Sequence, residues 1–214
     1  MNDIATVAKT TISNKATTSN DSGIIIHIET KKSWLKSTIF SDTSLLTRCV
    51  LESNSKLNQR PIIKVYGKIM HQNRNVGFFS DTSRGYTYSG QLALSKPLTI
   101  NLKKLLNVVN QMYNTNFNGI LVNQYMNGSD YIGAHSDDES GLGSAGVVAI
   151  SIGAVRKFRI RNITTRKIEK DILLENGMML QMGGDFQKEF THEIPIEKKV
   201  KDIRYSFTFR YHIA

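Results

Sequence analysis

The sequence predicts a mainly β protein with flanking helices (α+β), arranged as a jelly roll or small barrel around one core. Three observations support this fold class. The 214 residues are 40% hydrophobic and 21% charged, which is ordinary globular composition. Two apolar stripes of helical period come first, and short β segments separated by Gly, Asn and Asp turns follow them. Late strands of even spacing are typical of a jelly roll, which leaves the earlier helices packed outside.

The chain is expected to form one domain after an N-terminal tail. Residues 1–22 are rich in Ser, Thr and Asn without a sustained apolar period, which predicts a flexible segment. Residues 23–214 contain no internal repeat and no second domain boundary. No run reaches the length of about 18 apolar residues that crosses a bilayer. We therefore expect a soluble, intracellular protein without a membrane partner, and the sequence leaves nuclear versus cytoplasmic location open.

The first half of this domain is predicted to hold one strand and two helices. A short apolar strand is expected at Gly23–Ile28, and the first helix is expected to be capped by Asp42 or Ser44. Cys49 lies in this helix and, as the only cysteine, excludes an intramolecular disulfide and a cysteine-based zinc site. The second helix is expected after Asn101 as N-cap. The apolar stripes consist of Leu45, Leu46, Cys49 and Val50 in the first helix, and of Leu102, Leu105, Leu106, Val109, Met112 and Tyr113 in the second.

The second half is predicted to consist of strands. Apolar runs rich in β-branched or aromatic residues, bounded by turn residues, mark the candidates. The strands are expected at Gly119–Tyr125, Val147–Ile152, Lys157–Arg161, Gly177–Met182 and Arg204–Tyr211.

The net charge of +10 indicates the kind of molecule that the protein could bind. An excess of Lys and Arg, with a pI near 9.7, favours association with polyanions through phosphate contacts and counterion release. The alternative is a basic but inert surface. Charge thus supports a nucleic-acid partner without identifying one.

A metal-ligand pattern occurs in the segment Y-I-G-A-H-S-D-D-E. His135 and Asp137 are separated by one residue, so in extended backbone their side chains share a face. An imidazole and a carboxylate on one face are two members of the facial triad that binds non-haem Fe(II). The third ligand must be a later histidine, and His192 in F-T-H-E-I-P is the candidate apart from His212. Alone, the tripeptide is better explained by an exposed His and a solvated acidic loop.

The final segment R-Y-S-F-T-F-R-Y alternates strictly between polar and aromatic residues. One parity carries Arg204, Ser206, Thr208 and Arg210, and the other carries only Tyr and Phe. If the polar face lines a barrel, its guanidinium groups need an anion, and Arg is the side chain best shaped to bind a carboxylate. A dicarboxylate such as 2-oxoglutarate meets this need. The alternative is a surface strand with solvated arginines.

The order of N-Q-Y-M-N-G, H-S-D-D-E, F-T-H and R-Y-S-F-T-F-R resembles the AlkB family of nucleic-acid dealkylating dioxygenases, most closely its eukaryotic branch acting on duplex DNA. The resemblance runs from Pro61 to the C-terminus. It implies a double-stranded β-helix, at about 119–214, with a nucleotide-recognition lid at about 61–95. It also implies Fe(II), 2-oxoglutarate as cosubstrate and O₂.

The resemblance assigns roles to individual positions. The family usually has Asn where this chain has Ser206. V-Y-G-K resembles the family's base-displacing hairpin, with Tyr66 as a wedge where Phe is common, and Y-T-Y-S-G resembles the segment that stacks on the damaged base. The implied metal ligands are His135, Asp137 and His192. The implied 2-oxoglutarate contacts are Asn123, Tyr125, Arg204, Thr208 and Arg210. The implied substrate contacts are Tyr66, Gly67, Lys68, Arg74, Tyr86, Thr87, Tyr88, Asp138 and Glu139.

The implied function is oxidative demethylation of bases such as 1-methyladenine and 3-methylcytosine in DNA repair, with release of formaldehyde, succinate and CO₂. We expect a monomer that acts on alkylated nucleic acid, with DNA favoured over RNA. Two alternatives stay open. One is a 2-oxoglutarate-dependent hydroxylase of a protein or small molecule, and the other is a non-catalytic binder of modified nucleic acid.

Overall fold

The structure is a computed structural model that describes residues 23–65, 67–88, 91–137 and 146–212, with the side chains of Val65 and Tyr88 excepted. The predicted tail at residues 1–22 lies outside the described residues. Among the helices of the described ranges, none has the length and apolar character needed to cross a membrane.

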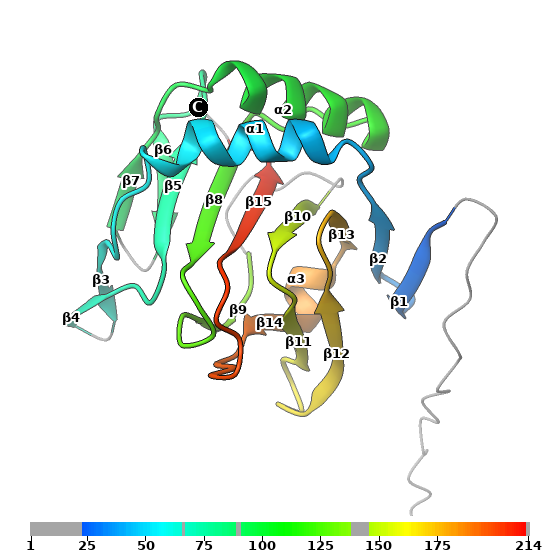
Figure 1. Cartoon of the computed structure of the whole chain (residues 1–214). Coiled ribbons are helices and arrows are strands. Elements are labelled where there is room, and N and C mark those ends of the chain that lie inside the picture. Colours follow the sequence, from blue (N-terminus) through cyan, green and yellow to red (C-terminus); the bar gives the residue numbers. More distant parts are fainter. Residues whose placement is uncertain (1–22, 66, 89–90, 138–145, 213–214) are drawn as a thin grey trace, which may run out of the picture.

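Two antiparallel sheets form the body of the molecule (Figure 1). The larger sheet has the strand order β1-β2-β13-β10-β15-β8-β5, and the smaller has the order β12-β11-β14-β9. The larger sheet comprises β1 (Ile25–Glu29), β2 (Ser33–Ile39), β5 (Asn75–Phe79), β8 (Gly119–Tyr125), β10 (Val147–Gly153), β13 (Met178–Gly184) and β15 (Arg204–Arg210). The smaller comprises β9 (Ile132–His135), β11 (Arg156–Asn162), β12 (Ile168–Leu174) and β14 (Phe190–Ile194), and α3 (Phe186–Glu189) precedes β14. The predicted jelly roll is confirmed.

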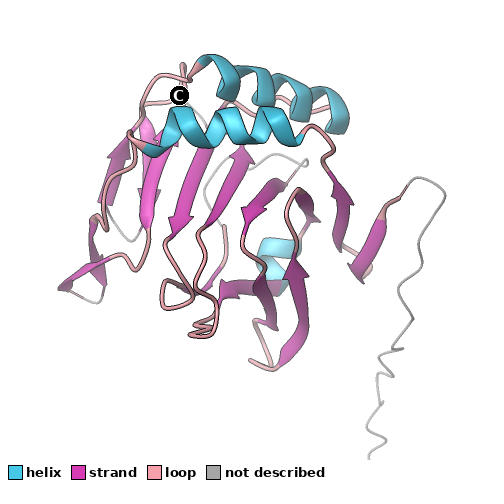
Figure 2. Ribbon diagram, viewed as in Figure 1, coloured by secondary structure: helices cyan, strands magenta, loops and turns pink. Residues whose placement is uncertain are grey.

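Helices α1 (Thr43–Asn54) and α2 (Ile100–Tyr113) lie side by side along one face of the larger sheet (Figure 2). Their apolar stripes enter one buried cluster with residues of β8, β10 and β15, which explains why each helix is amphipathic. The expected place of Met112 in this stripe was wrong, because its side chain is exposed in the last turn of α2. Asp42 caps α1 by accepting a hydrogen bond from the Leu45 amide at 2.9 Å. The expected cap of α2 was wrong by two positions, because Thr99 rather than Asn101 accepts from the Leu102 amide. Asn101 instead bonds to Glu52 of α1.

Strand β15 has the two faces that its alternation predicts. All seven of its residues are buried. Tyr205, Phe207 and Phe209 belong to the core under the helices, whereas Arg204 and Arg210 face a cavity between the sheets. The alternative of solvated arginines is therefore wrong. The strand ends one residue earlier than expected, and Tyr211 is exposed.

Two hairpins stand beside the β5 edge of the larger sheet (Figure 1). The first joins β3 (Ile62–Val65) to β4 (Lys68–His71), and the second joins β6 (Gly85–Tyr88) to β7 (Gln91–Leu94). The turn of the first contains Gly67 at a φ of +79°, a backbone conformation that favours glycine. Each hairpin is a separate two-stranded sheet. Both fall within the segment expected to form the lid.

Candidate metal centre and cosubstrate cavity

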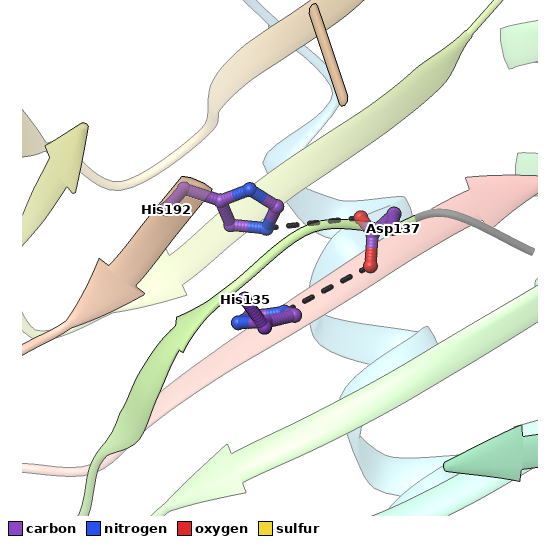
Figure 3. Close-up of side chains that lie close together, drawn as sticks. All are labelled: His135, Asp137 and His192. Atoms are coloured by element: carbon purple, nitrogen blue, oxygen red, sulfur yellow. Dashed lines mark ion pairs between the residues drawn. The ribbon is translucent and has the colours of Figure 1, made fainter. Parts of the chain in front are cut away.

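The three predicted metal ligands come together at one end of the smaller sheet (Figure 3). His135 ends β9, and Asp137 follows after one intervening residue. His192 lies on β14 directly opposite His135 in the antiparallel register. Asp137 carboxylate oxygens lie 3.8 Å from His135 Nε2 and 3.7 Å from His192 Nε2. One ligand atom of each residue lies within 4.8 Å of the others, so a single ion can bridge them.

Neighbouring groups orient these side chains. His135 Nδ1 donates to the Gly133 carbonyl at 2.9 Å, which turns Nε2 toward the cluster. The Asp137 amide donates to Gln187 of α3 at 2.9 Å. The His192 ring stacks on Phe158 with centroids 5.1 Å apart. The contact of His135 is of the kind that commonly orients metal-binding imidazoles, because it uses the ring nitrogen that does not face the cluster.

The electrostatics of the cluster suit a divalent cation. Burial would raise the pKa of Asp137, but Arg210, His192 and His135 together hold that pKa well below its usual value. Arg210 Nη2 lies 2.9 Å from the Asp137 carboxylate. Burial and then the neighbouring His135 lower the pKa of His192 to about 3, and burial also lowers the pKa of His135. Two neutral imidazoles and one carboxylate near neutral pH are a donor set that fits Fe(II).

Residues of β8 and β15 line the same cavity as the metal-ligand cluster. Arg204 is opposite Tyr125 in the strand register, and its guanidinium lies 5.2 Å from the centroid of that ring. Arg204 Nε donates to Ser151 Oγ at 2.8 Å, but the buried Nη1 has no hydrogen-bond partner among the described residues. Burial lowers the pKa of Arg204 to about 10, so the group is still cationic at neutral pH. The residues fit a carboxylate ligand. All five predicted cosubstrate residues line this cavity, namely Asn123, Tyr125, Arg204, Thr208 and Arg210.

The cavity also receives two of the predicted substrate residues. Tyr86 is buried, and the Arg210 guanidinium lies 5.0 Å from the centroid of its ring. Arg74 is buried as well, and its Nε donates to Asn123 Oδ1 at 2.7 Å. Arg210 thus lies between Tyr86 on one side and Asp137 on the other. This links the hairpin of β6 and β7 to the metal-ligand cluster through one guanidinium.

Three further predicted substrate residues that the structure describes do not line the cavity. Gly67 and Lys68 are exposed at the turn of the first hairpin, and Thr87 is exposed on β6. Tyr66, Asp138 and Glu139 lie outside the described residues, as does the side chain of Tyr88.

Several cavity or supporting residues were missed from the sequence. Ser151 had a signal, because it is a polar residue on the cavity-facing parity of an otherwise apolar strand. Phe158 and Gln187 had none, because their roles depend on contacts with β14 and the segment after β9. The apolar part of the cavity includes Leu174, Met178, Leu180, Met182 and Ile194.

His212, the other downstream histidine, lies outside the metal-ligand cluster. Its ring meets Phe78 edge-on at 4.7 Å, and burial, followed by the charge of Arg210, lowers its pKa to about 4.

The lowered pKa of His212 makes the stability of the protein depend on pH. In the unfolded chain this imidazole takes up a proton near pH 6.5, whereas in the folded chain it stays neutral until about pH 4. The free energy of unfolding therefore falls as the pH falls from 6.5 toward 4. The wild-type protein is expected to lose unfolding free energy between pH 7 and pH 5. In His212→Gln we expect this loss to be smaller by roughly 1–2 kcal/mol. Urea titrations at both pH values measure it, and equal losses in the two proteins would contradict it.

A double-stranded β-helix with two histidines and an aspartate beside an arginine-lined cavity defines the class of non-haem iron oxygenases that use a dicarboxylate cosubstrate. The model of the 2OG-Fe(II) oxygenase superfamily matches residues 31–210. The chain belongs to this family. The cofactors of the family are Fe(II), 2-oxoglutarate and O₂.

Similarity to curated proteins confirms the AlkB resemblance. DNA oxidative demethylase ALKBH2 of Bos taurus is 32% identical over 156 residues, which cover 69% of this chain and 56% of the bovine protein. The human alpha-ketoglutarate-dependent dioxygenase alkB homolog 3 is 33% identical over 118 residues, which cover 51% of this chain and 41% of that protein. The chain therefore spans little more than half the length of the bovine relative. The solved structure of OsALKBH1 superposes with a TM-score of 0.54 at 15% identity over 87% of this chain and 100% of that one, which supports the fold alone.

Proposed function

We propose that this protein is an Fe(II)- and 2-oxoglutarate-dependent demethylase of N-alkylated nucleic-acid bases, of the 1-methyladenine and 3-methylcytosine type, acting in DNA repair. The observation that carries the proposal is the convergence of His135, Asp137 and His192 on a cavity that also contains Arg204 and Tyr86. Relatives named DNA oxidative demethylases support the substrate class and the preference for DNA over RNA. The net charge of +10 is consistent with a polyanionic substrate.

In this proposal His135, Asp137 and His192 bind Fe(II), and the cationic wall of β15 binds the cosubstrate. When bound, iron and 2-oxoglutarate supply the oxidation by O₂ that releases the methyl group as formaldehyde and converts the cosubstrate to succinate and CO₂. Arg204 receives a carboxylate on Nη1, the guanidinium nitrogen without a partner among the described residues. Asn123, Tyr125, Thr208 and Arg210 complete the binding wall. The apolar residues of the cavity exclude water from the reacting groups.

The substrate base enters, we propose, from the side of the two hairpins, and residues 61–95 act as the nucleotide-recognition lid. Tyr86 stacks on the flipped base, because its ring already lies at the cavity wall beside Arg210. Arg74 lies at the same wall through its bond to Asn123. The hairpin tip with Tyr66, Gly67 and Lys68 displaces the base from the duplex. Thr87, Tyr88, Asp138 and Glu139 provide the further substrate contacts implied by the family resemblance.

We also propose that the protein acts as a monomer. The described metal and cosubstrate residues of a single chain line one cavity, which supports this proposal. Size-exclusion chromatography with light scattering is the direct measurement.

The proposal is tested with methylated oligonucleotides. Purified protein, Fe(II), ascorbate and 2-oxoglutarate are incubated with single- and double-stranded DNA and RNA that carry 1-methyladenine or 3-methylcytosine. We expect loss of one methyl group by mass spectrometry, with DNA converted faster than RNA. Succinate release without demethylation of any oligonucleotide would instead favour a protein or small-molecule hydroxylase. Absence of succinate release from iron-loaded protein would favour a non-catalytic binder.

A further inference from the structure

Arg60 has an unusual backbone conformation at the entrance to the first hairpin. Its φ of +40° is in the left-handed region that L side chains rarely adopt, and Pro61 and strand β3 follow it directly. Non-glycine residues persist in this region only where surrounding contacts fix them, and such residues gather at functional sites. The contacts that fix Arg60 therefore indicate which part of the structure depends on this backbone conformation.

Three contacts fix Arg60. Its amide donates to Asn75 Oδ1 at 3.1 Å, and its carbonyl accepts from His71 Nδ1 at 2.9 Å. Its Nη2 donates to Asp130 Oδ1 at 2.5 Å in an ion pair. The first two contacts fix the base of the hairpin to β5 and β4. The third reaches across to a distant part of the chain.

Asp130 lies in the loop that joins the proposed cosubstrate strand to the proposed metal strand. Tyr125 ends β8 before this loop, and His135 ends β9 after it. Asp130 is 2% exposed, and its second oxygen accepts from the Met126 amide at 2.8 Å. Its backbone carbonyl accepts from the fully buried Arg156 at 2.8 Å. One oxygen of the Asp130 carboxylate is therefore held by the backbone of its own loop, and the other forms the ion pair with Arg60.

Strand β3 of the hairpin also approaches β7, but the hairpin is not paired with the larger sheet. It forms a separate two-stranded sheet, and all four residues of β4 are exposed. A second tie lies close to the first, since the Tyr131 amide donates to the Asn73 carbonyl at 3.2 Å. Both ties join the base of the hairpin to the loop between β8 and β9.

We propose that Arg60 is a positioning residue, which through its ion pair with Asp130 fixes the first hairpin relative to the loop between β8 and β9, and so relative to the metal-ligand cluster at the end of that loop. This inference rests on the proposed function, in which the hairpin is the element that displaces the base from the duplex. Arg60 then governs productive binding of the methylated oligonucleotide and leaves cosubstrate binding unaffected. Displacement of a positioning element by about 1 Å costs up to about a hundredfold in rate in other enzymes.

The test compares Arg60→Gly, Arg60→Lys and Arg166→Gly. Glycine accepts the left-handed backbone, so Arg60→Gly removes the ion pair without adding strain. Arg166 is the matched control: it is an exposed arginine at a φ of +61°, and in the described part of the chain it forms no ion pair. The control thus has the same charge change and the same backbone conformation away from the hairpin.

We expect Arg60→Gly to lower kcat/KM for methylated duplex DNA by roughly tenfold, with most of the loss in KM for the oligonucleotide. The KM for 2-oxoglutarate and succinate release without DNA stay within about twofold of wild type, as expected for a group that contacts neither. Arg60→Lys restores part of the loss, because it keeps the cation beside Asp130. If Arg60→Gly behaves like Arg166→Gly, the inference is wrong.

Hydrogen exchange separates failure of this inference from failure of the proposed function. Arg60→Gly is expected to speed amide exchange in residues 61–72 relative to both wild type and Arg166→Gly, whatever the substrate is. Unchanged exchange in this segment overturns the ion pair as the hairpin's anchor. Faster exchange in a protein that demethylates no oligonucleotide keeps the anchor and rejects the demethylase proposal instead.

Discussion

Asp137→Ala is expected to lower 2-oxoglutarate turnover by about three orders of magnitude or more, because it removes the only anionic member of the metal-ligand cluster. The same substitution is expected to destabilise the metal-free protein. Asp137 is the partner of Arg210, and both side chains are nearly inaccessible to solvent. Removing one member of a buried ion pair typically costs about 3–5 kcal/mol, since the other charge stays in a medium of low dielectric constant.

Two measurements check these expectations. Succinate release under saturating iron reports turnover, and urea denaturation without metal reports the unfolding free energy. Asp185→Ala is the matched control, because Asp185 forms a solvent-screened pair with Lys188 at 2.8 Å, and such surface pairs contribute little to stability. If Asp137→Ala turns over 2-oxoglutarate as fast as the control variant does, Asp137 is not a metal ligand.

Arg204→Ala is expected to raise the KM for 2-oxoglutarate by about a hundredfold, because the charge-assisted and bidentate contacts of a guanidinium with a carboxylate are worth about 3 kcal/mol. Arg204→Lys keeps the charge but loses the planar group that bonds to Ser151 with Nε and leaves Nη1 for a ligand. We therefore expect Arg204→Lys to raise this KM by an intermediate factor.

Initial rates of succinate release over a range of 2-oxoglutarate concentrations measure the effect. Arg159→Ala is the control, since Arg159 of β11 pairs with Asp171 of β12 at 2.8 Å and does not line the cavity. A KM for Arg204→Ala equal to that of the control would show that the cosubstrate carboxylate binds elsewhere.

Some of this structure depends on local pattern and was therefore predictable. The amphipathic stripes of α1 and α2 follow the helical period, and β15 follows the strand period of two, so their buried faces could be assigned, except that the predicted Met112 of α2 is exposed. The boundary of α2 was less predictable, because Thr99 and Asn101 are both good caps and only the contact with Glu52 distinguishes them. Hairpin β3–β4 was identified through family resemblance rather than periodicity.

The sequence by itself determined the side-chain chemistry and the local faces: His135 and Asp137 alternate in extended backbone, and the arginines of β15 share one parity with its hydroxyl residues. Tertiary structure alone decided which distant strands meet. It brought His192 opposite His135, directed Arg210 to Asp137 and joined Arg60 to Asp130. The physical reason is that strand periodicity fixes the face of a side chain but carries no information about its partner across a sheet. That partner is set by the register and packing of segments far apart in the chain.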